Sequence, residues 1–147
     1  MPSPYVSNYG IETVTAATLT ITPEGYAGKT IVSNLAATQT FTLPAATGSG
    51  NRYDVIVQTT KTGDLVIQAA SASDTMDGYA ILAADAGDTV VMFATGATTD
   101  TVTLNGTTTG GIAGAKVGLV DIASGVWFVE VFSDASGTEA TPFSAAV

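Results

Sequence analysis

The sequence predicts an all-β protein, a single β-sandwich or jelly-roll-like barrel of about ten short strands. Short stretches rich in Val, Ile, Thr, Phe and Tyr recur along the 147 residues between Gly, Asn, Asp and Ser. Thr alone contributes 25 residues, and its branched β-carbon favours strands over helices. Strong helix formers are scarce, and apolar residues seldom follow the spacing of a helix face.

The individual strands follow from these stretches. We predict strands over residues 13–22, 29–33, 39–43, 53–59, 64–69, 78–82, 88–95, 100–104, 116–122 and 126–132. Phe41 and Leu43 alternate with threonines, which predicts one buried and one exposed face. Segments 90–94 and 126–132 are apolar on both faces, which suits a central strand or a strand covered by another subunit.

Turn residues separate the predicted strands. Thr62-Gly63 and Ser124-Gly125 each lie between two strands and predict hairpins. A turn followed by Asp-x-Val recurs at Asp64, Asp88 and Asp100 with no fixed period, so the sequence does not predict a solenoid repeat.

The two ends of the chain differ from its middle. Residues 1–11 have no periodicity and contain Pro2, Pro4, Tyr5 and Tyr9, which predicts an extended N-terminal arm. Residues 12–147 form the predicted sandwich, with a C-terminal tail from about residue 134. Residues 140–147, which include Phe143, are a second possible arm or plug.

The composition excludes much chemistry. The chain has no His and no Cys, so it has neither an imidazole base nor a thiol nucleophile, and no ordinary zinc site. Its net charge of −9 would repel nucleic acid. No stretch is long and apolar enough for a spanning helix, and the first residues do not resemble a secretory signal. We expect no enzyme, no cofactor and no membrane partner.

Carboxylates are the only candidate ligands or acids. Asp74 with Asp77, or Asp85 with Asp88, could help to hold Ca²⁺, although their spacing does not match an EF-hand loop. The alternative is that these aspartates cap turns. Glu130 lies within an apolar strand and is expected to face solvent or to pair with one of the four basic residues.

Strands whose edges lack Lys protection invite pairing with other strands. Closing the sheet, or burying edges and apolar faces in an oligomer, would solve this problem. We therefore expect a homo-oligomer. The expected core and oligomer interface consists of Phe93, Trp127, Phe128, Val129, Phe132 and Phe143.

The C-terminal half carries a family resemblance. The strand 101–104 leads through Asn105-Gly106 to the strand 116–121, then through Ser124-Gly125 to a strand bearing Trp127, and the chain ends near Pro142-Phe143. Upstream, the Thr-Leu-Pro strand end at 42–44 precedes a Gly-rich turn. This succession resembles small β-rich structural proteins of tailed bacteriophages: capsid decoration (cement) proteins, head fibres and tail-fibre modules.

The resemblance implies a virion protein that is made in the host cytoplasm and binds the outer surface of the phage head as a homotrimer. It would stabilise the lattice of the major capsid protein without a cofactor. The arm, with Pro2, Pro4, Tyr5 and Tyr9, is the candidate capsid anchor. The alternative is a receptor- or glycan-binding fibre module that uses exposed Tyr, Trp or Asp side chains.

Overall fold

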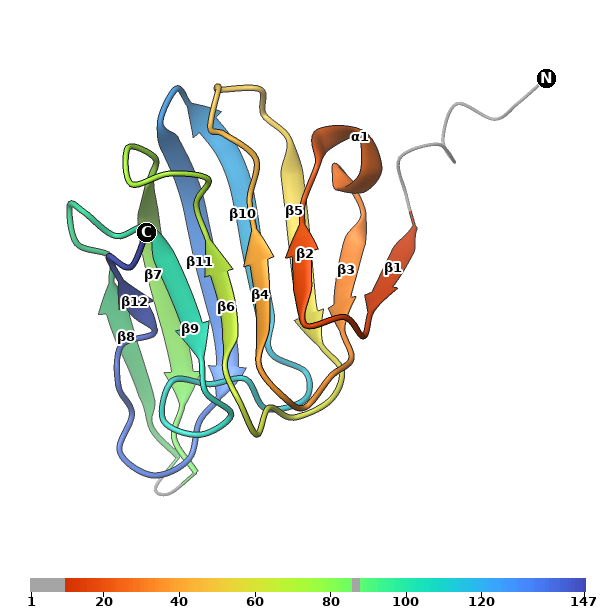
Figure 1. The fold of residues 1–147 in the computed structure, drawn as a ribbon. Coiled ribbons are helices and arrows are strands. Elements are labelled where there is room, and N and C mark those ends of the chain that lie inside the picture. The colour runs from red at the N-terminus through yellow and green to blue at the C-terminus, as the bar shows by residue number, and fades with distance from the viewer. Residues whose placement is uncertain (1–9, 86–87) are drawn as a thin grey trace.

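A computed structural model describes residues 10–85 and 88–147, which form two β-sheets packed face to face and one short helix (Figure 1). The strands are β1 (Ile11–Val14), β2 (Thr18–Thr20), β3 (Thr30–Ser33), β4 (Gln39–Thr42), β5 (Arg52–Val57), β6 (Leu65–Gln68), β7 (Thr75–Ala83), β8 (Val90–Ala94), β9 (Thr101–Leu104), β10 (Lys116–Ala123), β11 (Val126–Asp134) and β12 (Phe143–Ser144). The predicted all-β sandwich is confirmed.

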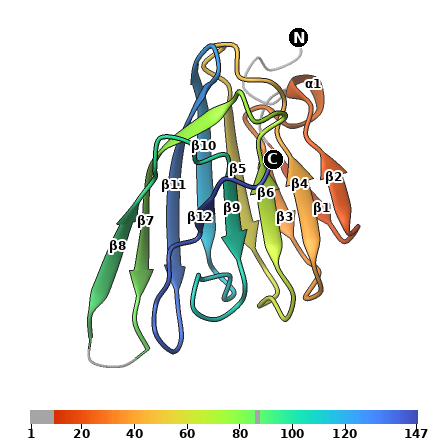
Figure 2. The same ribbon diagram turned by 60° about the vertical axis from the view of Figure 1, so that its left-hand side comes forward.

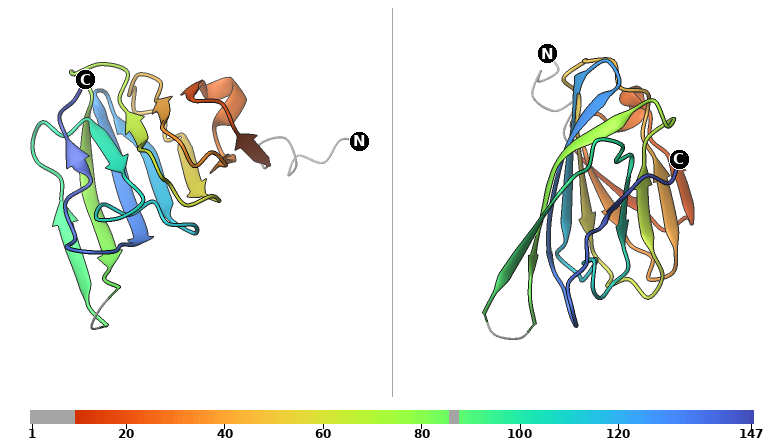
Figure 3. Two further views of the ribbon diagram at one scale, coloured as in Figure 1. Left: turned by 60° about the horizontal axis from the view of Figure 1, so that its bottom comes forward. Right: turned by 90° about the vertical axis from the view of Figure 1, so that its left-hand side faces the viewer.

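The two sheets differ in width. One sheet has seven strands in the order β1-β3-β5-β10-β11-β7-β8, and the other has five in the order β12-β9-β6-β4-β2. Both sheets mix parallel and antiparallel pairs, and neither closes into a barrel within the described residues. The β7–β8 hairpin leans out beyond the rest of the sandwich (Figures 2 and 3).

The first half of the chain alternates regularly between the two sheets. Strands β1, β3 and β5 pair in parallel in the wide sheet, while β2, β4 and β6 pair in parallel in the narrow one. The predicted hairpin at Thr62-Gly63 is therefore wrong, because its two strands belong to different sheets. The chain winds as a solenoid does, although the windings differ in length and left no fixed period in the sequence.

Hydrogen bonds from two buried side chains, Lys61 and Gln39, join the loops of this winding. The Nζ atom of Lys61, which is 3% exposed, donates hydrogen bonds to the carbonyl oxygens of Leu35 and Ala37 and to Oε1 of Gln39. The amide of Gln39 in turn donates to the carbonyl oxygens of Val14 and Ala16. Three successive loops thus meet at one corner with their inward backbone groups satisfied, as burial requires.

The predicted strand over 13–22 is interrupted in the structure. Residues 15–17 turn the chain from the wide sheet to the narrow one, between β1 and β2. A single helical turn, α1 (Pro23–Tyr26), then follows, with Thr22 as its N-cap and Pro23 at its first position.

The second half of the chain completes both sheets. Strands β10 and β11 form the hairpin predicted at Ser124-Gly125, with a register shift between Asp121 and Ala123. Strand β11 pairs in parallel with β7, which pairs with β8 at the end of the wide sheet. The C-terminal segment contributes β12, which pairs with β9 and forms one edge of the narrow sheet (Figure 1).

The core between the sheets is centred on two aromatic residues. The rings of Tyr53 and Trp127 meet edge to face with their centroids 5.7 Å apart, and both side chains are fully buried. Neither the Tyr53 hydroxyl nor Trp127 Nε1 has a hydrogen-bond partner among the described residues. Burial raises the pKa of Tyr53, so this hydroxyl stays protonated.

We expect Tyr53→Phe to leave the protein as stable as the wild type, or more stable by up to about 1 kcal/mol, because it removes an unpaired polar atom from the core. Denaturant unfolding gives the free energies of unfolding. Tyr79→Phe on the outer surface serves as the control, with an expected change below about 0.5 kcal/mol. A loss above about 1 kcal/mol in Tyr53→Phe would reveal a hydrogen bond from this hydroxyl.

Candidate interaction surface

The outer face of the seven-stranded sheet is unusually apolar around β7, β8 and β11. Because side chains alternate along a strand, the residues between the buried Trp127, Val129 and Val131 project outward. Together with outward side chains of the neighbouring strands they form what we call the apolar band: Tyr79, Ile81, Met92, Val120, Phe128 and Phe132. These six side chains are partly or fully exposed.

The strand register places the members of the band side by side. Phe132 lies across from Ile81, which lies across from Met92, so an apolar row crosses three strands. Phe132 is 41% exposed and Met92 is 65% exposed. A second contact joins Phe128 to Tyr79, whose rings meet edge to face at 6.3 Å. Exposed apolar side chains that gather in this way are typical of a protein–protein contact, and charged residues border them, since Lys116 lies across from Phe132 and Asp77 across from Phe128.

Glu130 lies in the middle of this outer face, between Phe128 and Phe132 on β11. It is partly buried and lies across from Gly118 on β10. A β-carbon added at Gly118 would come within 3.0 Å of the Glu130 side chain, so the glycine leaves room for this side chain to lie on the sheet. The acid thus occupies the outward side of its strand.

Two shallow hollows lie along the wide sheet, and the first of them borders the apolar band. One, of about 340 Å³, is lined by Ile81, Ala83, Phe132 and Asp134, together with residues of the loop at Gly114. The other, of about 460 Å³, lies over the far end of the same sheet and is lined by Ile11, Val32 and Ile56. Both could receive side chains of another protein.

The predicted interface residues divide between the core and the surface. Trp127 and Val129 lie in the core, Phe93 and Phe143 are partly buried against it, and Phe128 and Phe132 face outward in the apolar band. The candidate anchor residues Pro2, Pro4, Tyr5 and Tyr9 lie outside the described residues. Sequence reasoning did not identify Tyr79, Ile81 and Met92 as members of one surface, because their strands carry apolar residues on both faces.

The narrow sheet presents a different outer face. Threonines of β2, β4 and β9 form two rows with Val66 and Gln68 of β6. The strand register aligns these threonines across the sheet, and all but Thr101 are partly or fully exposed: Thr18, Thr20, Thr40, Thr42, Thr101 and Thr103. The outer face of the narrow sheet is therefore rich in hydroxyl groups, whereas the outer face of the wide sheet carries the apolar band. The two outer surfaces of the sandwich are therefore chemically distinct.

The aspartates singled out in the sequence do not converge on one point. The carboxylate of Asp74 accepts a hydrogen bond from the backbone N–H of Ala46 at 3.0 Å, which ties two loops together. Asp77 projects from β7 on the outer face. Within residues 10–85 and 88–147, no three acidic side chains gather as a metal site requires.

The most strongly held carboxylate is Asp121 on β10. It is 3% exposed and accepts hydrogen bonds from the backbone N–H groups of Thr47, Gly48 and Ser49 and from the Thr47 and Ser49 hydroxyls. Burial alone would raise its pKa, but the hydrogen bonds from Ser49, Gly48 and Thr47 outweigh burial and lower it to about 2. This saturated carboxylate shapes the loop between β4 and β5 and has no free oxygen for catalysis.

Asp100 plays a similar part at the C-terminal end. Its carboxylate accepts hydrogen bonds from the Thr101 hydroxyl and from the backbone N–H groups of Ala146 and Val147. Burial acts to raise its pKa, and these hydrogen bonds lower it by more. The carboxylate thus fixes the last residues of the chain beside β9.

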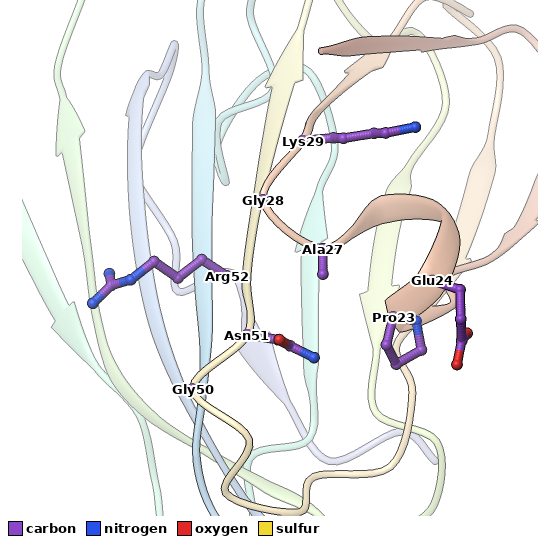
Figure 4. A pocket seen from close by; sticks show the side chains of 8 residues that line it. All are labelled: Pro23, Glu24, Ala27, Gly28, Lys29, Gly50, Asn51 and Arg52. Atoms are coloured by element: carbon purple, nitrogen blue, oxygen red, sulfur yellow. The ribbon is translucent and has the colours of Figure 1, made fainter. Parts of the chain in front are cut away.

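A third hollow, of about 460 Å³, lies beside α1 (Figure 4). It is lined by Pro23, Glu24, Ala27, Gly28, Lys29, Gly50, Asn51 and Arg52. The Lys29 and Arg52 side chains point in opposite directions, and Lys29 is paired with Glu12 at 2.7 Å. Polar groups that converge on one point define a ligand site, and these groups diverge.

Comparison with known proteins gives no match, either to a protein-family model or to a curated protein. Among the helices of the described residues, none is long and apolar enough to cross a membrane. The apolar band is therefore the surface on which a functional proposal can be based.

We expect Asp121→Asn to lower the free energy of unfolding at pH 7 by about 2 kcal/mol, because the carboxylate is the shared acceptor of one loop. A pKa of about 2 in the folded protein, below the unfolded value, means that this stabilisation is present above about pH 4 and is lost as the pH falls towards 2. Unfolding curves from pH 7 to pH 2 should therefore converge for the two proteins.

The matched control for this experiment is Asp54→Asn, which removes a more exposed carboxylate 3.6 Å from Lys116. We expect a change below about 1 kcal/mol. Equal effects of the two substitutions at pH 7 would contradict the special role of Asp121.

Proposed function

We propose that the chain is a virion structural protein: a capsid decoration (cement) protein that binds the outer surface of a phage head as a homotrimer. In this role it adds contacts between neighbouring subunits of the major capsid protein. The observation that carries the proposal is the apolar band, which lies on an open sheet face and suits contact with another folded protein.

The shape of the surface supports a contact between proteins over binding of a small ligand. The band lies on a sheet face with one shallow hollow beside it, whereas small-molecule sites are concave and enclose most of their ligand. Aromatic and Met side chains, here Phe128, Phe132, Tyr79 and Met92, are enriched in the centres of protein interfaces.

The construction of the core supports a mechanical role. The fold is held by a continuous apolar core between two sheets, and its buried polar side chains Lys61, Asp100 and Asp121 all bond to neighbouring loops. On a capsid, a trimer would contact several subunits at once, so modest contacts by each chain would give tight attachment through effective concentration.

The alternative, a receptor- or glycan-binding fibre module, needs exposed aromatic side chains for stacking on sugars. Two of the aromatic residues that could serve it, Tyr53 and Trp127, are fully buried. Tyr79 and Phe128 contact each other on the outer face, where they are part of the apolar band. Burial thus removes Tyr53 and Trp127 from any sugar-stacking surface and leaves Tyr79 and Phe128 as its candidates.

We expect the purified protein to bind saturably to heads assembled without it, and in multiples of three copies. Phe132→Ser should lower its occupancy on heads by at least about tenfold, because it removes the exposed aromatic side chain that begins the apolar row across β11, β7 and β8. Cryo-electron microscopy with copy counting measures the occupancy. The control is Val66→Ser on the outer face of the narrow sheet, which should bind as the wild type does.

The same experiment separates the two functions. Absence of binding to heads, together with binding to host polysaccharide, would overturn decoration in favour of the fibre module. Equal losses of occupancy in Phe132→Ser and Val66→Ser would refute the role given to the apolar band.

A further inference from the structure

The four edges of the two sheets differ in how they are protected from pairing with other strands. Strand β1 carries Glu12 on its inward side, across from the buried Ile31, and this glutamate pairs with Lys29. Strand β2 has only three residues, and β12 has two and follows Pro142. An inward charge, a short strand and a proline are all known means of blocking an edge.

Strand β8 has none of these protections. It has five residues, all uncharged and none of them proline: Val90, Val91, Met92, Phe93 and Ala94. It pairs only with β7 and forms the outer end of the wide sheet, where no other described element covers its free side (Figures 1 and 2). Val90 and Met92 are 64% and 65% exposed.

The hydrogen-bond pattern shows which backbone groups of β8 are free. Thr89 accepts a hydrogen bond from Ala84, and Thr95 donates one to Gly78, so the odd-numbered residues face β7. Bonded and non-bonded pairs alternate in an antiparallel ladder. The N–H and C=O groups of Val90, Met92 and Ala94 therefore point away from the sheet.

We propose that β8 is a self-association edge, on which β8 of a second copy of this chain pairs antiparallel about a twofold axis at Met92. In this register Val90 of one copy lies across from Ala94 of the other, and each Met92 lies across from its counterpart. The three free N–H and three free C=O groups of each strand are then all satisfied. Both wide sheets join into one continuous sheet.

The sequence of β8 is complementary to itself in this arrangement. Asp88, the charged residue next to the strand, lies across from Gly96, so like charges do not oppose each other in a chain of net charge −9. The apolar row from Phe132 through Ile81 to Met92 continues into the same row of the second copy. A twofold contact of this kind closes on itself and does not propagate into a fibre.

The pairing is independent of the proposed decoration role. Alone it gives a dimer of twice 14.7 kDa, and combined with a threefold contact it gives a pair of trimers where the two axes intersect. Failure to bind heads would overturn decoration and leave the pairing intact. A solution mass that does not change when β8 is altered would overturn the pairing and leave decoration intact.

The test is sedimentation equilibrium of the full chain and of Met92→Lys, up to about 0.5 mM, because a contact built on a single strand edge is small and weak. Two lysines facing each other at the twofold axis should raise the dissociation constant at least about tenfold. The matched control, Ile11→Lys, adds the same charge at an equally exposed position on the β1 edge and should associate as the wild type does. A wild-type mass that is monomeric at all concentrations, or unchanged by Met92→Lys, would overturn the proposal.

Amide hydrogen exchange gives a second readout that does not depend on a variant. In the paired protein the amides of Val90, Met92 and Ala94 should be protected together with those of Val91 and Phe93, and dilution should remove protection from the first three only. Fast exchange at Met92 at the highest concentration would refute pairing at this edge.

Discussion

The buried corner around Lys61 is the interaction on which the arrangement of the two sheets depends. Chains that alternate between sheets must pass backbone through the corner of the sandwich, where carbonyl groups cannot reach water. Lys61 and Gln39 satisfy five such acceptors between them, four of which are backbone carbonyl oxygens from the two preceding loops. Lys61, whose pKa burial lowers, and Gln39 join the three loops that connect β1 to β2, β3 to β4 and β5 to β6. Removing either side chain would leave these acceptors without their partner.

The position of the interaction surfaces follows from this winding. The windings build three of the seven strands of the wide sheet and three of the five strands of the narrow one, and the rest of the chain adds four strands to the wide sheet and two to the narrow sheet. The apolar band and the open edge of β8 lie next to each other at one end of the wide sheet, on strands that the second half of the chain adds.

Much of the fold could be predicted from local sequence, and the topology could not. Alternation and turn residues marked nearly every strand, and Ser124-Gly125 marked a true hairpin. The Thr62-Gly63 turn has the same local character, yet the strands on either side of it belong to different sheets. Lys61, next to this turn, forms hydrogen bonds with residues that lie 22 to 26 positions earlier in the chain. Long-range contacts of this kind leave no periodic signal.

The candidate surface could be predicted only in part, because its assembly also depends on long-range strand pairing. The sequence indicated that 126–132 is apolar on both faces, and the structure assigns Trp127 and Val129 to the core and Phe128 and Phe132 to the outside. Which strands flank β11, and hence that Tyr79 and Ile81 join Phe128 and Phe132, depends on the parallel pairing of β7 with β11. That pairing joins segments about fifty residues apart and could not be inferred from either segment alone.

In the proposed role, the apolar side of the wide sheet, and not the threonine-rich side of the narrow sheet, contacts other protein chains. A cryo-electron microscopy reconstruction of the protein bound to a phage head tests this most directly, because it shows which surface is covered. We expect Phe132, Tyr79 and Met92 to be buried against other chains, while Thr40 and Thr42 face solvent. A reconstruction with the threonine rows in contact and the apolar band exposed would contradict it.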